Sequence, residues 1–357
     1  KGPVLVDMPK DVLIGESEFK IPNKVKLKNY SENPELQKKD FNKFKSALKN
    51  SNKPLLIYGR GSCAESNTKY IEKISQIFKI PSLSSILSLG VLGKSKNNFG
   101  LVGEEGSYAS NILINESDLI ISIGCDLKKI IPESSLDGKK MVVVNIDNTQ
   151  FLNDNKNILN ILTNSSFFLE AFSRLKDKMK FSWDKEDLSL LHKKNSENKL
   201  KIISKNKKAF IFSTLSELLG DKAIICSDFS YEDVNLQQFY NFTDYRNSIM
   251  SGGVGTPGYG FPAAIGAKFS RPRSKVVSIS SGENFQFNMQ ELIVAREQKL
   301  DLTIIVLNED SQLNGKGHEN PDYKMMGESF GVKSVTINLG KNIKNQLKKH
   351  LSHKGLR

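Results

Sequence analysis

The most informative part of the chain is residues 276–309, which read VVSISSGENFQFNMQELIVAREQKLDLTIIVLNE. The runs 276–279 and 302–307 are rich in Val, Ile and Leu, as buried strands are. Between them, residues 288–299 have the apolar spacing of an amphipathic helix. One face of this predicted helix carries Met289, Leu292 and Ile293. The stretch therefore predicts a strand–helix–strand unit.

A short polar motif follows each of these two strands. Ser-Gly-Glu-Asn-Phe occupies residues 281–285, and Asn308-Glu309 comes after the second strand, with Glu309 27 positions after Gly282. A right-handed crossover places both motifs at the carboxyl ends of neighbouring parallel strands. A helix that starts there offers backbone N–H groups to an anion such as phosphate. The pattern is typical of a diphosphate-and-metal site, although Gly282 supplies no acid.

The composition indicates a globular protein with room for two α/β domains. The chain has 357 residues, of which 38% are hydrophobic and 25% charged. No apolar run approaches the roughly 18 residues that cross a bilayer, so we expect no membrane partner. The three cysteines, Cys63, Cys125 and Cys226, are far apart and form no CxxC motif. We therefore expect free thiols and a reducing compartment, the cytoplasm.

The net charge of +13 has two interpretations. A basic surface can bind nucleic acid, or it can be a solvated, lysine-rich exterior. Most of the excess is lysine spread through connecting segments and helix faces, and no RNA-binding or zinc-finger motif accompanies it. We favour the solvated surface and do not expect nucleic acid as a partner.

Several more segments predict parallel strands that alternate with helices. Strands are expected at residues 54–58, 119–124, 141–147 and 223–226, and a helix at 64–78. Continuous apolar strands of this kind indicate sheets covered on both faces. The predicted fold class is therefore α/β, with two three-layer domains and mainly parallel sheets.

The domain organisation is predicted from changes in composition along the chain. Residues 1–35 are interpreted as a strand and an extended connector, and residues 36–175 as a first domain. Residues 176–208 are polar and lysine-rich, so we interpret them as a linker that contains a helix. Residues 209–357 form the second domain. The first and last residues suggest a piece of something longer.

Two features of the first domain allow a nucleotide contact or a plain turn. Gly59-Arg60-Gly61 follows a strand and resembles half of a dinucleotide fingerprint, but the third glycine is missing. Asp147 ends a strand, where an acid can bind a ribose hydroxyl or simply form a turn.

A glycine-rich loop gives a more specific signal. Residues 251–260 contain five glycines and precede a helix of small residues. Glycine lets the backbone approach a ligand closely, so we favour a ligand-facing loop over a purely structural one.

Taken together, these motifs resemble the thiamine-diphosphate-dependent enzymes that act on 2-oxoacids, in particular the acetolactate synthase branch. The resemblance covers nearly the whole chain and rests on the glycine loop, the 281–309 motifs and several shorter matches: residues 106–108, Asn111, 117–119, 290–292 and 320–323. It implies a remnant of the pyrimidine domain at the start, then the nucleotide-binding-like central domain, then the diphosphate-binding domain, which we expect to be truncated at its C-terminus.

The resemblance also implies which residues would hold the cofactor and its metal. The family's metal ligands correspond to Gly282, Glu309 and the backbone of Ser311. Mg²⁺ requires oxygen ligands, and the side chain of a glycine offers none. Glu309 could still coordinate the metal. Glu283, which follows Gly282 in the sequence, could also do so after a backbone shift. The cofactor-binding positions are Gly255, Pro257, Gly282, Glu283, Asn284 and Glu232.

Several of these positions depart from the family pattern. Glu232 and Glu283 would oppose a diphosphate with like charge, which is costly when buried. Pro257 occupies the place of the apolar residue that supports the bent cofactor. Residues 126–130 differ from the family's FAD-binding run, so we expect no FAD. The catalytic glutamate belongs to the pyrimidine domain, and no catalytic residue is assigned here.

Two functions follow from the resemblance. The chain is an acetolactate synthase-like carboligase or decarboxylase, impaired by these departures, that needs a pyrimidine domain or subunit, forms a homo- or hetero-oligomer and serves branched-chain amino acid biosynthesis. Alternatively, it is a catalytically silent homologue retained for assembly or for another ligand. A basic binding protein is a third, weaker hypothesis.

Overall fold

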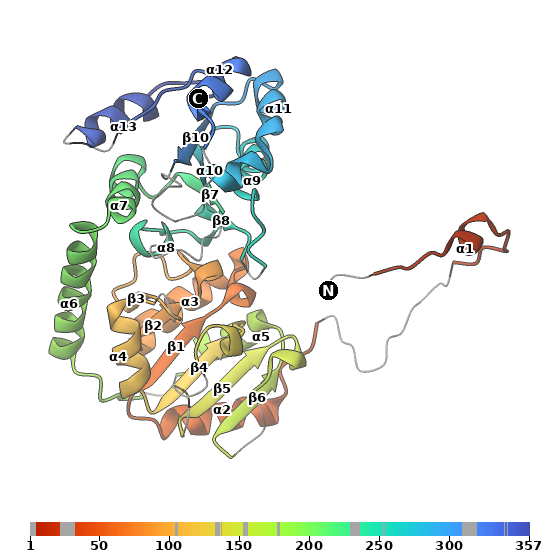
Figure 1. Cartoon of the computed structure of the whole chain (residues 1–357). Coiled ribbons are helices and arrows are strands. Elements are labelled where there is room, and N and C mark those ends of the chain that lie inside the picture. The colour runs from red at the N-terminus through yellow and green to blue at the C-terminus, as the bar shows by residue number, and fades with distance from the viewer. Residues whose placement is uncertain are drawn as a thin grey trace.

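The body of the molecule consists of two parallel sheets with helices on both faces (Figure 1). The computed structural model describes residues 5–21, 33–103, 106–132, 136, 138–152, 156–176, 179–228, 236–252, 254–308, 320–338, 340 and 342–357.

The first sheet has six parallel strands in the order β3-β2-β1-β4-β5-β6. The strands are β1 Pro54–Tyr58, β2 Ser82–Ser84, β3 Asn98–Leu101, β4 Leu119–Ile123, β5 Lys140–Asn145 and β6 Ile158–Leu162. The central strands β1 and β4 are buried along their whole length. Their continuous apolar sequences suit this position, because both faces of the sheet are covered.

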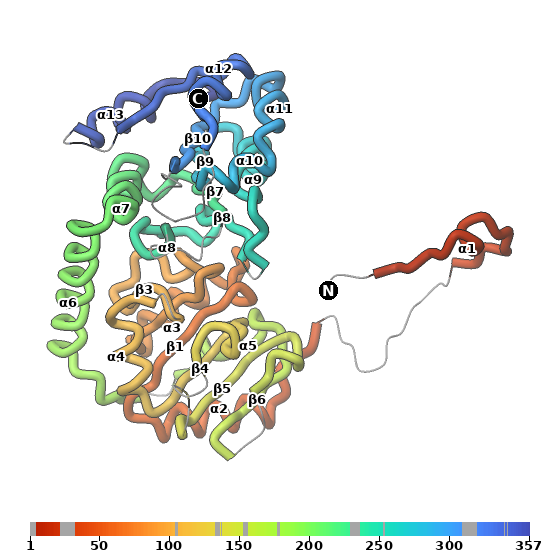
Figure 2. The backbone as a smooth tube through the Cα atoms, in the orientation of Figure 1, coloured from red at the N-terminus to blue at the C-terminus, as the bar shows by residue number. Residues whose placement is uncertain are grey.

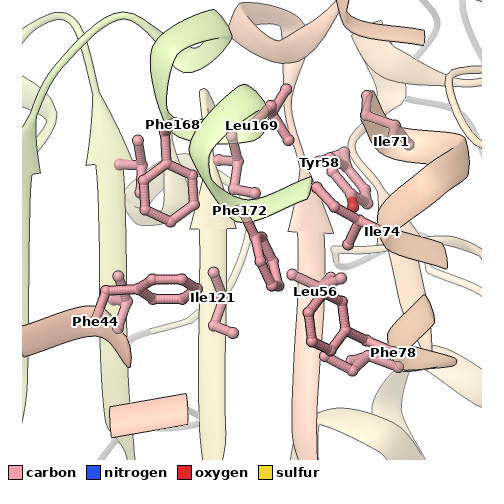
Figure 3. Packing of buried hydrophobic residues seen from close by; sticks show 14 of the residues in the cluster. Phe44, Leu56, Tyr58, Ile71, Ile74, Phe78, Ile121, Phe168, Leu169 and Phe172 are labelled. Carbon is pink, nitrogen blue, oxygen red and sulfur yellow. The ribbon is translucent and has the colours of Figure 1, made fainter. Parts of the chain in front are cut away.

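Helices cover the two faces of this sheet as separate layers. One layer contains α2 Lys38–Lys49, α3 Glu65–Phe78 and α5 Ser165–Ser173, and the other contains α4 Tyr108–Glu116 and α6 Lys185–Ile203. Along β1, Leu56 and Tyr58 face the first layer, whereas Leu55 and Ile57 face the second. In the first layer, Phe44 packs edge-on against two rings of α5 at 4.8 and 5.0 Å (Figure 3).

The second sheet has four parallel strands in the order β10-β9-β7-β8. The strands are β7 Ile224–Ser227, β8 Ser248–Met250, β9 Val276–Ser281 and β10 Leu302–Leu307. One face packs against α9 Gly260–Ser270, α10 Gly282–Gln286, α11 Leu292–Glu297 and α12 Tyr323–Ser329. The other packs against α7 Lys207–Leu219, α8 Leu236–Phe239 and α13 Ile343–Leu351. The predicted fold class of two three-layer α/β domains is confirmed.

The main differences from the predicted elements concern short segments. The helix predicted at 288–299 is a 3-10 turn, η7 Met289–Glu291, followed by the two-turn α11. Leu292 and Ala295 are its buried residues, and Ile293 is 41% exposed, so its predicted place on the buried face is wrong. Residue 293 lies about 100° around the helix from residue 292, outside so narrow a buried stripe. The other 3-10 turns are η1 Arg60–Ser62, η2 Ile86–Ser88, η3 Leu127–Lys129, η5 Asn148–Gln150 and η6 Tyr245–Asn247.

The N-terminal segment does not form the predicted strand in the part that is described. Residues 5–9 are extended and exposed, and a short helix, α1 Lys10–Ile14, follows them. Leu5 is 94% exposed. In Figures 1 and 2 this segment lies away from both sheets. A strand needs hydrogen bonds from a neighbouring strand, and neither described sheet provides one here.

The two sheets meet through the segment between β2 and β3, which we call the junction (residues 85–94). Leu89 belongs to the hydrophobic cluster of the second sheet, beside residues of α7 and α8. A Cβ at Gly90 would lie 2.5 Å from the backbone carbon of Asp244, so the two backbones are in close contact. Lys94 adds an ion pair with Asp221 at 2.6 Å. Within the described residues, no helix is both long enough and apolar enough to cross a membrane.

Candidate functional site

The two polar motifs of residues 281–309 are brought together by the register of the second sheet. Leu307 of β10 lies opposite Ser281 of β9, and both strands run in the same direction. Gly282 and Asn308 therefore follow directly from neighbouring strand ends, as the strand–helix–strand pattern predicts. The Ser281 hydroxyl accepts a hydrogen bond from the Asn284 N–H at 3.2 Å, so α10 begins at Gly282.

The space beside Gly282 is filled by the side chain of Tyr323. A Cβ at position 282 would lie 2.8 Å from both Cε2 and Cζ of Tyr323, and closer still to its hydroxyl oxygen. The ring is held in this place from three sides. Asp322 caps α12 by accepting from the Met325 N–H at 3.0 Å, the Tyr323 hydroxyl accepts from Gln286 at 2.9 Å, and Phe285 packs edge-on at 6.4 Å. A longer side chain at position 282 would have to displace this half-buried ring.

The environment of the Tyr323 hydroxyl favours its neutral form. Burial raises the pKa of this phenol, and the negative charge of Glu283 raises it further, while the hydrogen bond from Gln286 acts in the opposite direction. The net shift is upward. Tyr323 is therefore a neutral, partly buried group at the position where the sequence pattern places a metal.

Glu283 and Asn284 have different roles in this turn. Glu283 is exposed, so the burial penalty expected for its charge does not arise. Ser281 fixes the start of α10 at Gly282. The side chain of Glu283, the next residue, is exposed to solvent, so it does not take the place of a metal ligand at position 282. The backbone N–H of Asn284 is already engaged by the cap.

The glycine-rich loop packs directly against α10. Gly258 has φ +78°, and a Cβ there would lie 2.7 Å from Phe287 and 2.8 Å from the side chain of Asn288. The same Asn288 amide donates to the Gly258 carbonyl at 2.8 Å. Gly255 also has a positive φ, +71°, and Pro257 is exposed on the loop. The structure thus brings the predicted loop and the predicted turn into one site.

One residue of this site was not predicted from the sequence. Asp228 follows β7 and accepts from the Gly260 N–H at 3.0 Å, which anchors the start of α9. Its second carboxylate oxygen is buried and accepts no hydrogen bond from a described residue. The sequence did offer a signal for Asp228, because it is an acid directly after an apolar strand, as Asp147 is.

The remaining predicted ligands are only partly visible. Asn308 is exposed, and its side-chain oxygen accepts from Asn320 at 2.8 Å. Glu309, Ser311 and Glu232 lie outside the described residues. Within the part of the chain that is described, no three His, Cys, Asp or Glu side chains come close enough to hold a metal ion.

The glycine turn of the first domain has a structural role. Gly61 donates its N–H to the Gly124 carbonyl at 2.9 Å. A Cβ at Gly59 would overlap the Gly124 carbonyl oxygen and would lie 2.6 Å from the Cβ of Cys125. These glycines therefore allow the ends of β1 and β4 to touch. Asp147 caps η5 by accepting from the Thr149 N–H at 2.9 Å, which is the turn-forming alternative.

The three cysteines are free thiols, as expected. Burial raises the pKa of Cys63 to about 11 and those of Cys125 and Cys226 to about 12, so all three stay protonated and unreactive at neutral pH.

Two sequence families match the two sheets separately. Residues 41–172 match the central domain of thiamine pyrophosphate enzymes, and residues 232–357 match their C-terminal TPP binding domain. This chain belongs to the thiamine-diphosphate-dependent enzyme family. The second match contains Gly282, Tyr323 and the glycine loop, so the site described above lies in the domain that binds the diphosphate in this family.

Curated relatives place the chain on the acetolactate synthase-like branch of the family. It is 26% identical over 388 residues to the acetolactate synthase large subunit of Buchnera aphidicola subsp. Schlechtendalia chinensis, and 28% over 391 residues to the probable large subunit of Methanocaldococcus jannaschii. The Haemophilus influenzae large subunit is 27% identical over 387 residues. These alignments cover 97–99% of this chain but 64–66% of the relatives.

The described residues of this thiamine-diphosphate family member do not fit the family's metal at Gly282. That position has no ligand atom in its side chain, and a tyrosine ring occupies the space where one would reach. In the described residues, the strand and helix ends of the site are present, and position 282 supplies no side-chain ligand.

Proposed function

We propose that this chain is an acetolactate synthase-like homologue that does not hold thiamine diphosphate and Mg²⁺ in the family's manner and has no acetolactate synthase activity of its own. One observation carries the proposal: the Tyr323 ring lies within 2.8 Å of any Cβ at position 282. A carboxylate cannot be restored there without moving the ring. The chain is retained for assembly with other subunits or for a different ligand.

The first domain supports a similar proposal for FAD. The N–H of Gly61 donates to Gly124, so one donor of the glycine turn is unavailable to a phosphate. The helix that follows, α3, begins with an acid, Glu65, which disfavours an anion at its N-terminus. We therefore propose that FAD is not bound. The free thiols support a reducing compartment, the cytoplasm.

A second candidate function is supported by the relatives, which are named acetolactate synthase large subunits. In that case the chain is an impaired carboligase or decarboxylase of branched-chain amino acid biosynthesis. Its activity would require a pyrimidine domain from another chain, within a homo- or hetero-oligomer. Metal binding would then depend on residues other than Gly282.

Calorimetry distinguishes the two candidates. The chain is titrated with thiamine diphosphate at saturating Mg²⁺ and again with EDTA, with a pyrimidine domain supplied as a separate chain. We expect no Mg²⁺-dependent binding up to millimolar cofactor. Micromolar binding that is lost with EDTA would exclude the silent homologue and favour the impaired enzyme.

A pair of variants tests the role of Tyr323. The double variant Gly282→Asp/Tyr323→Ala supplies the carboxylate and the space together, and we expect it to gain Mg²⁺-dependent binding. Gly282→Asp with Tyr108→Ala, which removes an exposed tyrosine of the first domain, is the matched control and should gain nothing. Equal binding by both double variants would show that Tyr323 does not block the position.

A further inference from the structure

A basic, aromatic groove lies beside β3, the edge strand of the first sheet, well away from Gly282. It has a volume of about 1110 Å³, slightly above the roughly 300–1,000 Å³ of most small-molecule sites. The C-terminal half of α3, the turn before β3 and residues 179–192 form its walls. The glycine turn at Gly59 precedes α3, whereas the groove borders the other end of that helix. The groove is therefore separate from the position of the family's nucleotide turn.

Aromatic rings form the apolar part of the groove. Phe99 is buried, and His192 stacks on it with ring centres 3.9 Å apart and an interplanar angle of 19°. Phe181 and Trp183 are half-buried in the wall opposite α3. The Trp183 ring is fixed because its N–H donates to the Pro54 carbonyl at 2.7 Å. Phe99 is covered by His192, and Lys53 lies over the Trp183 ring at 5.1 Å. The rings with exposed surface in the groove are therefore His192, Phe181 and Trp183, and a planar ring can stack on such surfaces.

Lysines surround these rings. The groove is lined by Lys79, Lys94, Lys96 and Lys185, and Glu72 is the one acidic side chain among its described lining residues. Lys94 pairs with Asp221, whereas Lys79, Lys96 and Lys185 have no described carboxylate within 4 Å.

The positive charge extends beyond the groove. A second hollow of about 660 Å³ shares Phe78 and Met179 with it and adds Lys73, Arg174 and Lys176. Of these cations, Arg174 is paired with Glu170. The positive potential therefore follows the whole length of the depression.

We propose that this groove binds a nucleotide, with its base stacked among the aromatic rings and its phosphates along the lysines. The lysines are exposed, so they add electrostatic attraction for a polyanion, while the half-buried rings add apolar surface for a planar group. A ligand that is both planar and polyanionic can contact the aromatic rings and the lysines at the same time. This proposal does not rest on the loss of the metal site.

The chain provides its own reporter for the test, because Trp183 is its only tryptophan. We expect ADP to change the fluorescence of Trp183 with saturation below millimolar concentration. Adenosine and inorganic pyrophosphate, each carrying half of the ligand, should bind at least tenfold more weakly. No saturable change with ADP up to several millimolar, or pyrophosphate binding as tightly as ADP, would overturn the proposal.

Paired lysine variants locate the binding. Lys96→Gln/Lys185→Gln removes two exposed charges on different walls of the groove, and we expect ADP affinity to fall at least tenfold. Lys39→Gln/Lys43→Gln, two exposed lysines of α2, is the matched control and should leave the affinity unchanged. Equal affinity in the groove variant and the control would overturn the assignment to this groove.

Thiamine diphosphate is itself an aromatic diphosphate, so it could enter the same groove. Binding there would persist with EDTA and would fall in Lys96→Gln/Lys185→Gln. Binding at the Gly282 site would require Mg²⁺ and would be insensitive to these lysines. The two proposals can therefore fail independently.

Discussion

At the scale of single residues, the contact between Gly282 and Tyr323 leads to a stability prediction. Alanine is usually better than glycine in a helix by about 1 kcal/mol. At position 282, however, the added methyl group would overlap the Tyr323 ring, and overpacking of this kind costs about 1–3 kcal/mol. We expect Gly282→Ala to lower the free energy of unfolding, as measured by urea denaturation.

The chain offers a matched control for this substitution. Gly266 lies in α9, and a Cβ there would meet nothing within 4 Å, so Gly266→Ala should be neutral or slightly stabilising. Adding Tyr323→Ala to Gly282→Ala should recover part of the loss. If Gly282→Ala were as stable as Gly266→Ala, the ring would not be packed where the structure has it.

Single residues also mark the limit of what the sequence could predict about this site. The missing acid at Gly282 follows from the resemblance, which places the family's metal ligands at Gly282 and Glu309, 27 positions apart. The role of Tyr323 does not follow from it, because its place depends on the path of the chain from β10 to α12. Tyr323 ends a short family match, residues 320–323, and that match gives no signal that its hydroxyl fills the space beside Gly282.

At the scale of elements, the contact between the ends of β1 and β4 depends on Gly59. A Cβ there would overlap backbone atoms of Gly124 and Cys125, which cannot move without separating the two strands. We expect Gly59→Ala to destabilise the chain by about 3 kcal/mol or more, as measured by chemical denaturation. Gly340→Ala is the control, since nothing lies within 4 Å of a Cβ at that position. A loss under about 1 kcal/mol would contradict this packing.

The elements that the sequence predicted well are those whose sequences are continuously apolar. β1, β4, β9 and β10 are long apolar runs, and their positions follow from composition alone. The strands β3 and β8 have three or four residues each and lie at sheet edges. Strands this short carry too few residues to show a pattern, so their sequences resemble loops, and only the pairing with a neighbour makes them strands.

At the scale of the whole molecule, the junction couples the two sheets. Leu89 is 9% exposed and belongs to the cluster of the second sheet, although it lies between two strands of the first. Truncation of a buried leucine costs about 2–5 kcal/mol. We expect the two units to unfold together in the unmodified chain, and we expect Leu89→Ala to separate their unfolding.

Two probes followed during denaturation test this coupling. Fluorescence of Trp183 reports the first unit, and far-ultraviolet circular dichroism reports both. The two transitions should coincide in the unmodified chain and in Leu200→Ala, which removes a leucine that is 64% exposed. They should differ in Leu89→Ala. Coincident transitions in Leu89→Ala would mean that the junction does not carry the coupling.

The tyrosine beside Gly282 also constrains how this lineage can change. If aspartate arose first at position 282, its side chain would overlap the Tyr323 ring and lower the stability of the fold. Metal binding could not offset this loss while the ring occupied the space. If Tyr323 were replaced first, the chain would pass through an intermediate with a small void and no new activity. Each order passes through an intermediate with lost packing, so a gain of metal binding at position 282 requires both changes. A packed side chain can therefore make the gain of a metal ligand at a neighbouring position depend on a second substitution.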